Sequence, residues 1–141
     1  MLSQPENLCA VRSAVETIAG RMGMDEKRRS ELVIAVDEAM TNIIRHGYKG
    51  DPQQPIHVKV WPAEHNGRAA VQVDIVDECA DADPSRIRAR EIDLANPEPG
   101  GLGVRLIRDA TDHLDVSARD DGPGLRLSMY KYIEPVSDPE G

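Results

Sequence analysis

Three polar side chains recur every four residues in the most strongly periodic segment of the sequence. Glu38, Asn42 and His46 therefore share one face if this segment is an α-helix. The residues between them are apolar at helical spacing, so this polar line runs close to a buried stripe, where a carboxylate and an amide need partners. A carboxylate can act as a general base, and an amide oxygen suits Mg²⁺. Taken alone, Glu38 and Asn42 also fit an ordinary solvated helix face.

Two more features could add to this chemistry. Asp77 stands at the end of an alternating strand, where its carboxylate could accept a hydrogen bond from an exocyclic amine or simply end the strand in a turn. Gly100-Gly101-Leu102-Gly103 precedes a helical pattern, and such glycines either let backbone amides approach a phosphate or form a hinge. No Gly-Lys-Ser/Thr follows and no strand precedes this run, which excludes a Walker loop and a dinucleotide fingerprint.

The elements that must position these residues are read from hydrophobic periodicity. Apolar steps of three and four predict a helix from Asn7 to Met22 and a second one between Asp25, as N-cap, and Gly47. Alternation predicts two strands joined by a turn at Asn66-Gly67. The remaining predicted elements are the second strand ending at 76–77, a loop at 79–100, a helix at 101–111 and strands at 114–116 and 125–129.

This order of elements predicts one α+β domain, 1–141, built as a two-layer α/β sandwich. Helices would cover one face of a mixed, mostly antiparallel sheet, and the segment 134–141 would form a tail. The third helix follows a loop of about twenty residues, a length typical of functional lids.

Composition excludes several classes of partner. The 141 residues include 25 acidic and 17 basic side chains, a net charge of −8, which argues against nucleic acid and against an anionic membrane surface. No apolar run is long enough to span a bilayer. The two cysteines are far apart and the histidines lack metal-ligand spacing, so we expect a reduced, cytoplasmic protein.

Together, the three polar features resemble a known family. The segment 37–48, Asp-Glu-Ala-Met-Thr-Asn-Ile-Ile-Arg-His-Gly-Tyr, resembles the N-box of the GHKL superfamily, whose fold is the Bergerat or histidine-kinase-like ATPase fold. More narrowly it is similar to the bacterial anti-sigma factor serine/threonine-protein kinases. Asp77 matches the first glycine-box position and Gly101-Leu102-Gly103 the second. The resemblance spans 6–132, nearly the whole chain, in the family's order of elements.

The resemblance implies a role for each matched residue. Glu38 would be the catalytic general base toward a substrate serine, and Asn42 would bind the Mg²⁺ that bridges the triphosphate. Asp77 would bind the adenine amine, and 79–100 would be the ATP lid. The other residues implied to bind ATP are Gly101, Leu102, Gly103 and Val104, with Arg45 and Arg105 adding positive charge near the phosphates.

The implied function is that of an ATP-dependent serine kinase acting as an anti-sigma factor. It would sequester a sigma factor, phosphorylate an anti-anti-sigma antagonist protein, and work as a homodimer. The sequence departs from the family at Cys79 and Asp81, which stand where the first glycine box has glycines. A catalytically degenerate protein-binding module therefore stays open as an alternative. An ATPase module of a larger signalling protein is a further one.

Overall fold

The computed structural model describes residues 5–44, 55–78, 106–119, 122 and 124–134. Their elements are the helices α1 (Pro5–Arg21) and α2 (Glu26–Asn42), a short helix at 106–110, and four strands. The strands are β1 (Ile56–His65), β2 (Arg68–Asp77), β3 (His113–Ala118) and β4 (Leu125–Tyr132). The element types and their order are those expected from the sequence.

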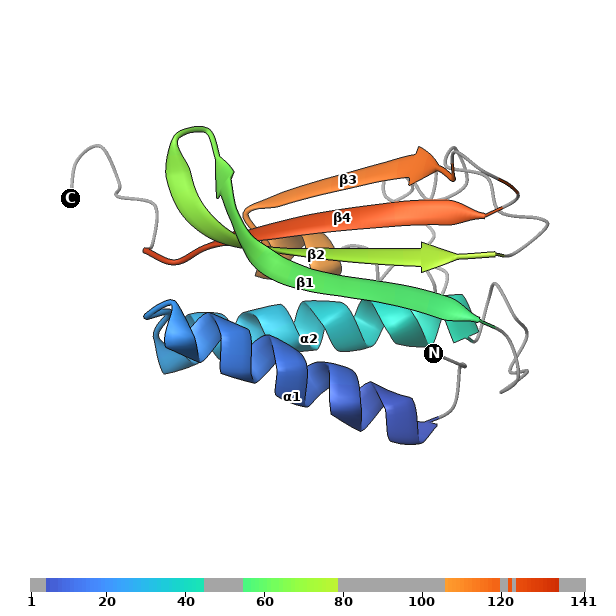
Figure 1. Ribbon diagram of the computed structural model, residues 1–141, viewed down its shortest axis with the longest axis horizontal. Coiled ribbons are helices and arrows are strands. Elements are labelled where there is room, and N and C mark those ends of the chain that lie inside the picture. Colours follow the sequence, from blue (N-terminus) through green and yellow to red (C-terminus); the bar gives the residue numbers. More distant parts are fainter. Residues whose placement is uncertain (1–4, 45–54, 79–105, 120–121, 123, 135–141) are drawn as a thin grey trace, which may run out of the picture.

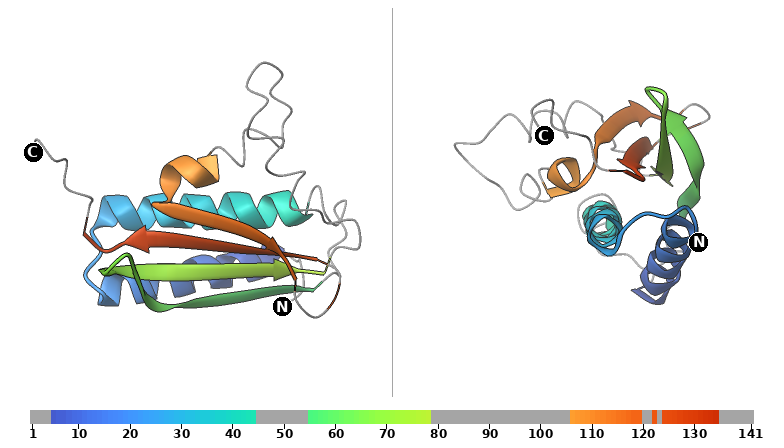
Figure 2. Two further views of the ribbon diagram at one scale, coloured as in Figure 1. Left: turned by 90° about the horizontal axis from the view of Figure 1, so that it is seen from above. Right: turned by 90° about the vertical axis from the view of Figure 1, so that its left-hand side faces the viewer.

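The molecule has two layers, a sheet and a helix layer that covers one face of it (Figure 1). The strand order is β1-β2-β4-β3, and every pairing is antiparallel. The parallel component of the expected mixed sheet is therefore absent among the described strands. The short helix at 106–110 lies beside α2, on the side away from α1 (Figure 2).

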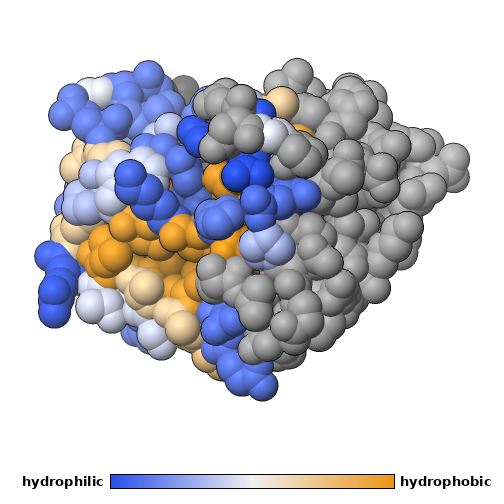
Figure 3. Space-filling view, turned by 45° about the vertical axis from the view of Figure 1, so that its right-hand side comes forward, coloured by the Kyte–Doolittle hydropathy of each residue, from blue (hydrophilic) through white to orange (hydrophobic). Residues whose placement is uncertain are grey.

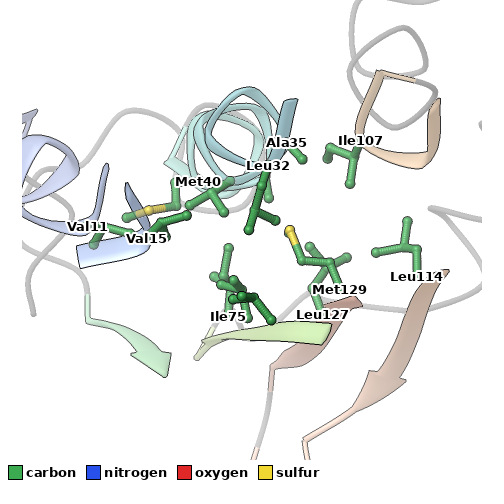
Figure 4. Close-up of a cluster of buried hydrophobic side chains, with 14 of the residues drawn as sticks. Val11, Val15, Leu32, Ala35, Met40, Ile75, Ile107, Leu114, Leu127 and Met129 are labelled. Atoms are coloured by element: carbon green, nitrogen blue, oxygen red, sulfur yellow. The ribbon is translucent and has the colours of Figure 1, made fainter. Parts of the chain in front are cut away.

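Aliphatic side chains and methionines fill the space between the layers (Figure 4). Leu32 and Met40 of α2 face Ile75 of β2 and Met129 of β4, and all four are fully buried. Because strand side chains alternate between faces, the odd-numbered residues of β2 form its core row. Asp77 is the last member of that row and thus lies on the helix side of the sheet.

Local signals in the sequence explain where the elements begin and turn. The Asp25 side chain accepts a hydrogen bond from the Arg28 N–H at 2.8 Å, which confirms the expected N-cap of α2. Asn66 and Gly67 have φ values of 53° and 76°, so they form the two-residue turn that matches the twist of a hairpin. The helix expected to reach Gly47 is α-helical to Asn42, and 43–44 form a π turn.

Apolar surface is exposed on the side of the molecule where β1 and α1 lie (Figure 3). The partly buried hydrophobic residues of these two elements are Leu8, Val58 and Val60. No helix in the described part of the chain is long and apolar enough to cross a membrane.

Candidate nucleotide-binding site

Glu38 and Asn42 are both half-buried on α2, near its C-terminal end. Spacing of three and four places them on one helix face with Glu31 and Ala35. Ala35 is fully buried and lies toward Ile107 of the short helix (Figure 4). The α2 face that presents the predicted base and metal ligand is therefore the face turned toward the short helix.

The neighbouring carboxylate, Asp37, projects to the other side of α2. Its Oδ1 lies 2.6 Å from Nε of Arg12, so this ion pair ties α2 to α1. The hydrogen bond to Asp37 raises the pKa of the Arg12 guanidinium. The ion pair to α1 is thus made by Asp37 and not by the predicted base, Glu38, which follows it on α2.

Asp77 is 5% exposed and bonded to the start of the neighbouring strand. Its Oδ1 accepts a hydrogen bond from the Leu125 N–H at 3.1 Å. Gly124, just before Leu125, has a φ of +132°, and a Cβ built there would stand 2.0 Å from the Asp77 carbonyl oxygen. Only glycine fits this approach, so the backbone of β4 lies directly against the end of β2. Asp77 thus anchors the start of β4, and its role in binding adenine stays a prediction.

An ion pair next to Asp77 joins the residue that follows β2, Glu78, to the residue that follows β3, Arg119. Arg119 Nη1 lies 2.9 Å from Glu78 Oε1, and His57 Nε2 lies 3.7 Å from Glu78 Oε2. The Arg119 N–H also donates to the Gly124 carbonyl at 3.0 Å. These contacts hold Arg119 and Gly124, which flank the connection between β3 and β4, against the end of β2. Sequence reasoning missed them because the partners are 41 residues apart and no periodic pattern links them.

The predicted metal ligand, Asn42, and the predicted adenine-binding residue, Asp77, lie at the same end of the molecule. α2 ends at Asn42 where β2 ends at Asp77, and Asp77 is in the strand row that faces the helices (Figure 1). The roles of Glu38, Asn42 and Asp77 in catalysis and in binding ATP and Mg²⁺ stay predictions. The lid at 79–100 and most of the tail lie outside the described part of the chain. So do the other predicted ATP-binding residues, which are Arg45, Gly101, Leu102, Gly103, Val104 and Arg105.

The donor set near α2 fits Mg²⁺ held mainly by a nucleotide. Among the described residues, no group of three or more His, Cys, Asp or Glu side chains could hold a metal ion. One amide oxygen completed by phosphate oxygens and water would suit Mg²⁺, which keeps several waters.

These features define a class of protein. A helix layer on one face of an antiparallel sheet, an acid and an amide on the long helix, and a buried aspartate at the end of β2 are the architecture of a GHKL-type ATPase domain. The family model described as histidine kinase-like ATPase domain matches residues 1–131. The chain belongs to this family.

Curated relatives agree with this assignment. The serine-protein kinase RsbW of Bacillus subtilis is 28% identical over 140 residues, covering 93% of this chain and 81% of the relative. The RsbW of Listeria innocua is 31% identical over 138 residues, with coverage of 93% and 83%. The serine/threonine-protein kinase BtrW of Bordetella bronchiseptica is 31% identical over 124 residues, with coverage of 85% and 83%.

A solved structure supports the fold. The histidine kinase domain of a blue-light activated histidine kinase from Erythrobacter litoralis matches with a TM-score of 0.51 and 18% identity. The match covers 89% of this chain and 59% of that chain.

Proposed function

We propose that this chain is an ATP-dependent protein serine/threonine kinase that acts as an anti-sigma factor. Its family and its kinase relatives support the activity. The observation that bears most weight is the α2 face with Glu38 and Asn42 one turn apart, at the end of the molecule where Asp77 closes β2. The proposed substrate is a serine of an anti-anti-sigma antagonist, and the second partner is a sigma factor in the cytoplasm.

ATP would supply the phosphoryl group, and bound Mg²⁺ would neutralise the charge that develops on it. The Asn42 amide oxygen would be a ligand of the metal, and Asp77 would accept a hydrogen bond from the adenine amine. Residues 101–104, with Arg45 and Arg105, would bind the phosphates. Glu38 would receive the proton of the serine hydroxyl as the serine oxygen bonds to the terminal phosphorus of ATP. The bond from that phosphorus to the ADP oxygen would break in the same step.

The test is phosphate transfer to the antagonist with Glu38→Gln. We expect transfer to fall by about 10²-fold or more, because a general base contributes this much, while the affinity for Mg-ATP is nearly unchanged. Glu26→Gln is a matched control, since Glu26 is exposed in the first turn of the same helix. Equal transfer rates in Glu38→Gln and the wild type would remove Glu38 from the role of base.

One departure in sequence favours the second candidate, a non-catalytic binding module. Cys79 and Asp81 add side chains where the family's first glycine box lets the nucleotide approach. The same assay separates the two functions. A wild-type protein that binds the sigma factor but neither binds Mg-ATP nor transfers phosphate would be the binding module.

The outer face of the sheet supports a homodimer. Both long helices lie on the opposite face of the sheet (Figure 2). Aromatic rings gather on the outer face, where the ring centroids of His65 and His113 are 4.6 Å apart and the rings of Tyr130 and Tyr132 lie beside His65. Trp61 lies opposite Gln72 in the same row as Tyr130. Tyrosine and tryptophan are enriched at protein interfaces.

Sedimentation tests this interface directly. Tyr130→Glu should convert a dimer to a monomer, because it places a charge in the centre of the aromatic cluster. Thr17→Glu, on the exposed side of α1, is the control and should leave the dimer intact. A wild-type protein that sediments as a monomer at micromolar concentration would contradict the homodimer.

A further inference from the structure

A buried lysine lies far from the predicted base, at the opposite end of α2. Lys131 is 2% exposed and points from β4 into the space between the layers. Its Nζ lies 2.7 Å from Glu31 Oε2 and donates to the Ala110 carbonyl at 2.6 Å. A lysine is almost never fully buried without partners, because removing its charge from water is costly. These two contacts join β4, α2 and the end of the short helix at one atom.

A second cation, Arg28, lies on α2 one turn before Glu31 and also contacts β4 and the residues that follow the short helix. Arg28 Nη2 lies 2.6 Å from Asp112 Oδ2, and Arg28 Nε donates to the Tyr132 carbonyl at 3.0 Å. Asp112 Oδ2 also accepts a hydrogen bond from the Tyr132 N–H at 2.8 Å. We call Arg28, Glu31, Asp112 and Lys131 the polar cluster. It attaches segment 106–112 to α2 and β4 through charged hydrogen bonds, which are stronger than neutral ones.

The polar cluster and the predicted catalytic residues occupy one face of α2. Residues 28, 31, 35, 38 and 42 follow each other at spacings of three and four. Ala35 lies in the middle of this face, against Ile107. Segment 106–112 is therefore fixed on the same helix face that presents Glu38 and Asn42.

The short helix depends on these contacts for its position. The described residues of this helix, 106–110, form at most one or two hydrogen-bonded turns, and a stretch of this length is unstable alone in water. Inside this segment, Thr111 Oγ1 donates to the Ile107 carbonyl at 2.8 Å, which ties the end of the helix to its own backbone. The contacts that join the segment to the rest of the protein include the packing of Ile107, the hydrogen bond from the Asp112 N–H to the Tyr130 carbonyl at 2.9 Å, and the polar cluster.

We propose that Lys131, paired with Glu31, is a positioning residue for nucleotide binding. It holds segment 106–112, which begins two residues after residues 101–104, against the α2 face of Glu38 and Asn42. This inference rests on the proposed function, since residues 101–104 are the proposed phosphate ligands. Lys131 itself touches neither nucleotide nor substrate, and acts through the placement of segment 106–112.

The first test uses the protein without nucleotide. Lys131→Met keeps the length of the side chain and removes the charge, and Lys131→Arg retains the charge. We expect amide hydrogen exchange in 106–112 to rise about tenfold in Lys131→Met, with α1 little changed and with partial restoration in Lys131→Arg. Arg126→Met is the control, because Arg126 is an exposed cation on the same strand as Lys131. Exchange in 106–112 that equals the wild type, or that rises equally in α1, would overturn the inference.

The second test measures phosphate transfer to the antagonist. The KM for ATP should rise several-fold in Lys131→Met while kcat changes less, and Lys131→Arg should recover most of the affinity. Glu31→Gln serves if Lys131→Met does not fold, because it weakens the same pair and leaves the lysine in place. An unchanged KM beside a faster exchange would overturn the link to the nucleotide. A wild-type protein without transfer would instead refute the proposed function, while hydrogen exchange would still decide the role of Lys131.

Discussion

Gly124 shows how one residue can fix the approach of two strands. A Cβ at this position would stand 2.0 Å from the Asp77 carbonyl oxygen, a backbone atom that cannot move aside cheaply. Gly124→Ala should therefore lower the free energy of unfolding by about 2 kcal/mol or more, in urea denaturation. Gly67→Ala is the matched control. It also has a positive φ but nothing within 4 Å, so it should cost only about 1 kcal/mol. Equal losses in the two variants would contradict this account.

The lowered pKa of Glu31 predicts how the free energy of unfolding changes with pH. The hydrogen bond from Lys131 is the main cause that lowers the pKa of Glu31 from its ordinary value of 4.5, and burial opposes it. A lowered pKa in the folded state stabilises the protein above the unfolded pKa, and this stabilisation is lost as the pH falls through the folded value. The difference in unfolding free energy between the wild type and Glu31→Gln should be about 1 kcal/mol at pH 7 and shrink below pH 4.5.

Urea denaturation between pH 7 and pH 3.5 measures this difference. Glu26→Gln serves as the control, because Glu26 is an exposed carboxylate in the first turn of the same helix. A difference between wild type and Glu31→Gln that stays constant across the range would mean that the Lys131 pair does not set the titration of Glu31.

The elements of this fold were predictable where neighbouring residues determine them. The N-cap at Asp25 and the turn at Asn66-Gly67 depend on contacts within three residues, and both are confirmed. The ion pair of Lys131 with Glu31 depends on partners 100 residues apart, and the bond from Leu125 to Asp77 spans 48. No local pattern signals such pairs, so the sequence placed the candidate site residues on elements but not their supporting contacts.

The N-cap of α2 gives a prediction at the scale of the element. Asp25→Ala removes the side-chain acceptor for the Arg28 N–H and leaves an orphan donor at the start of the helix. We expect a loss of about 1 kcal/mol in the free energy of unfolding, while Asp25→Ser should keep most of the cap. The same loss in both variants would assign the effect to charge rather than to capping.

At the scale of the whole molecule, the two ends of α2 have different tasks. Its N-terminal end joins the polar cluster, and its C-terminal end lies with the end of β2 (Figure 1). The net charge of −8 opposes the approach of a triphosphate, so binding must rely on local groups and on the metal. The charged contacts at one end of α2 and the proposed nucleotide site at the other end suit a domain whose binding segment is held by distant contacts.

Nucleotide binding should therefore stabilise the whole fold. A ligand that binds only the folded state at 100 times its Kd adds about 2.7 kcal/mol, which raises the Tm by roughly 8 °C for a domain of this size. We expect Mg-ATP to produce a shift of this order in a thermal scan. Mg-GTP should produce a smaller shift, because the guanine ring presents a carbonyl oxygen where adenine has the amine that Asp77 is proposed to bind.

Asp77→Asn provides the matched test. The amide oxygen of Asn can still accept the hydrogen bond from the Leu125 N–H, but the NH₂ group that replaces the second carboxylate oxygen cannot accept one from the adenine amine. This variant should fold and lose most of the shift. A full shift in Asp77→Asn would show that the nucleotide binds without this residue.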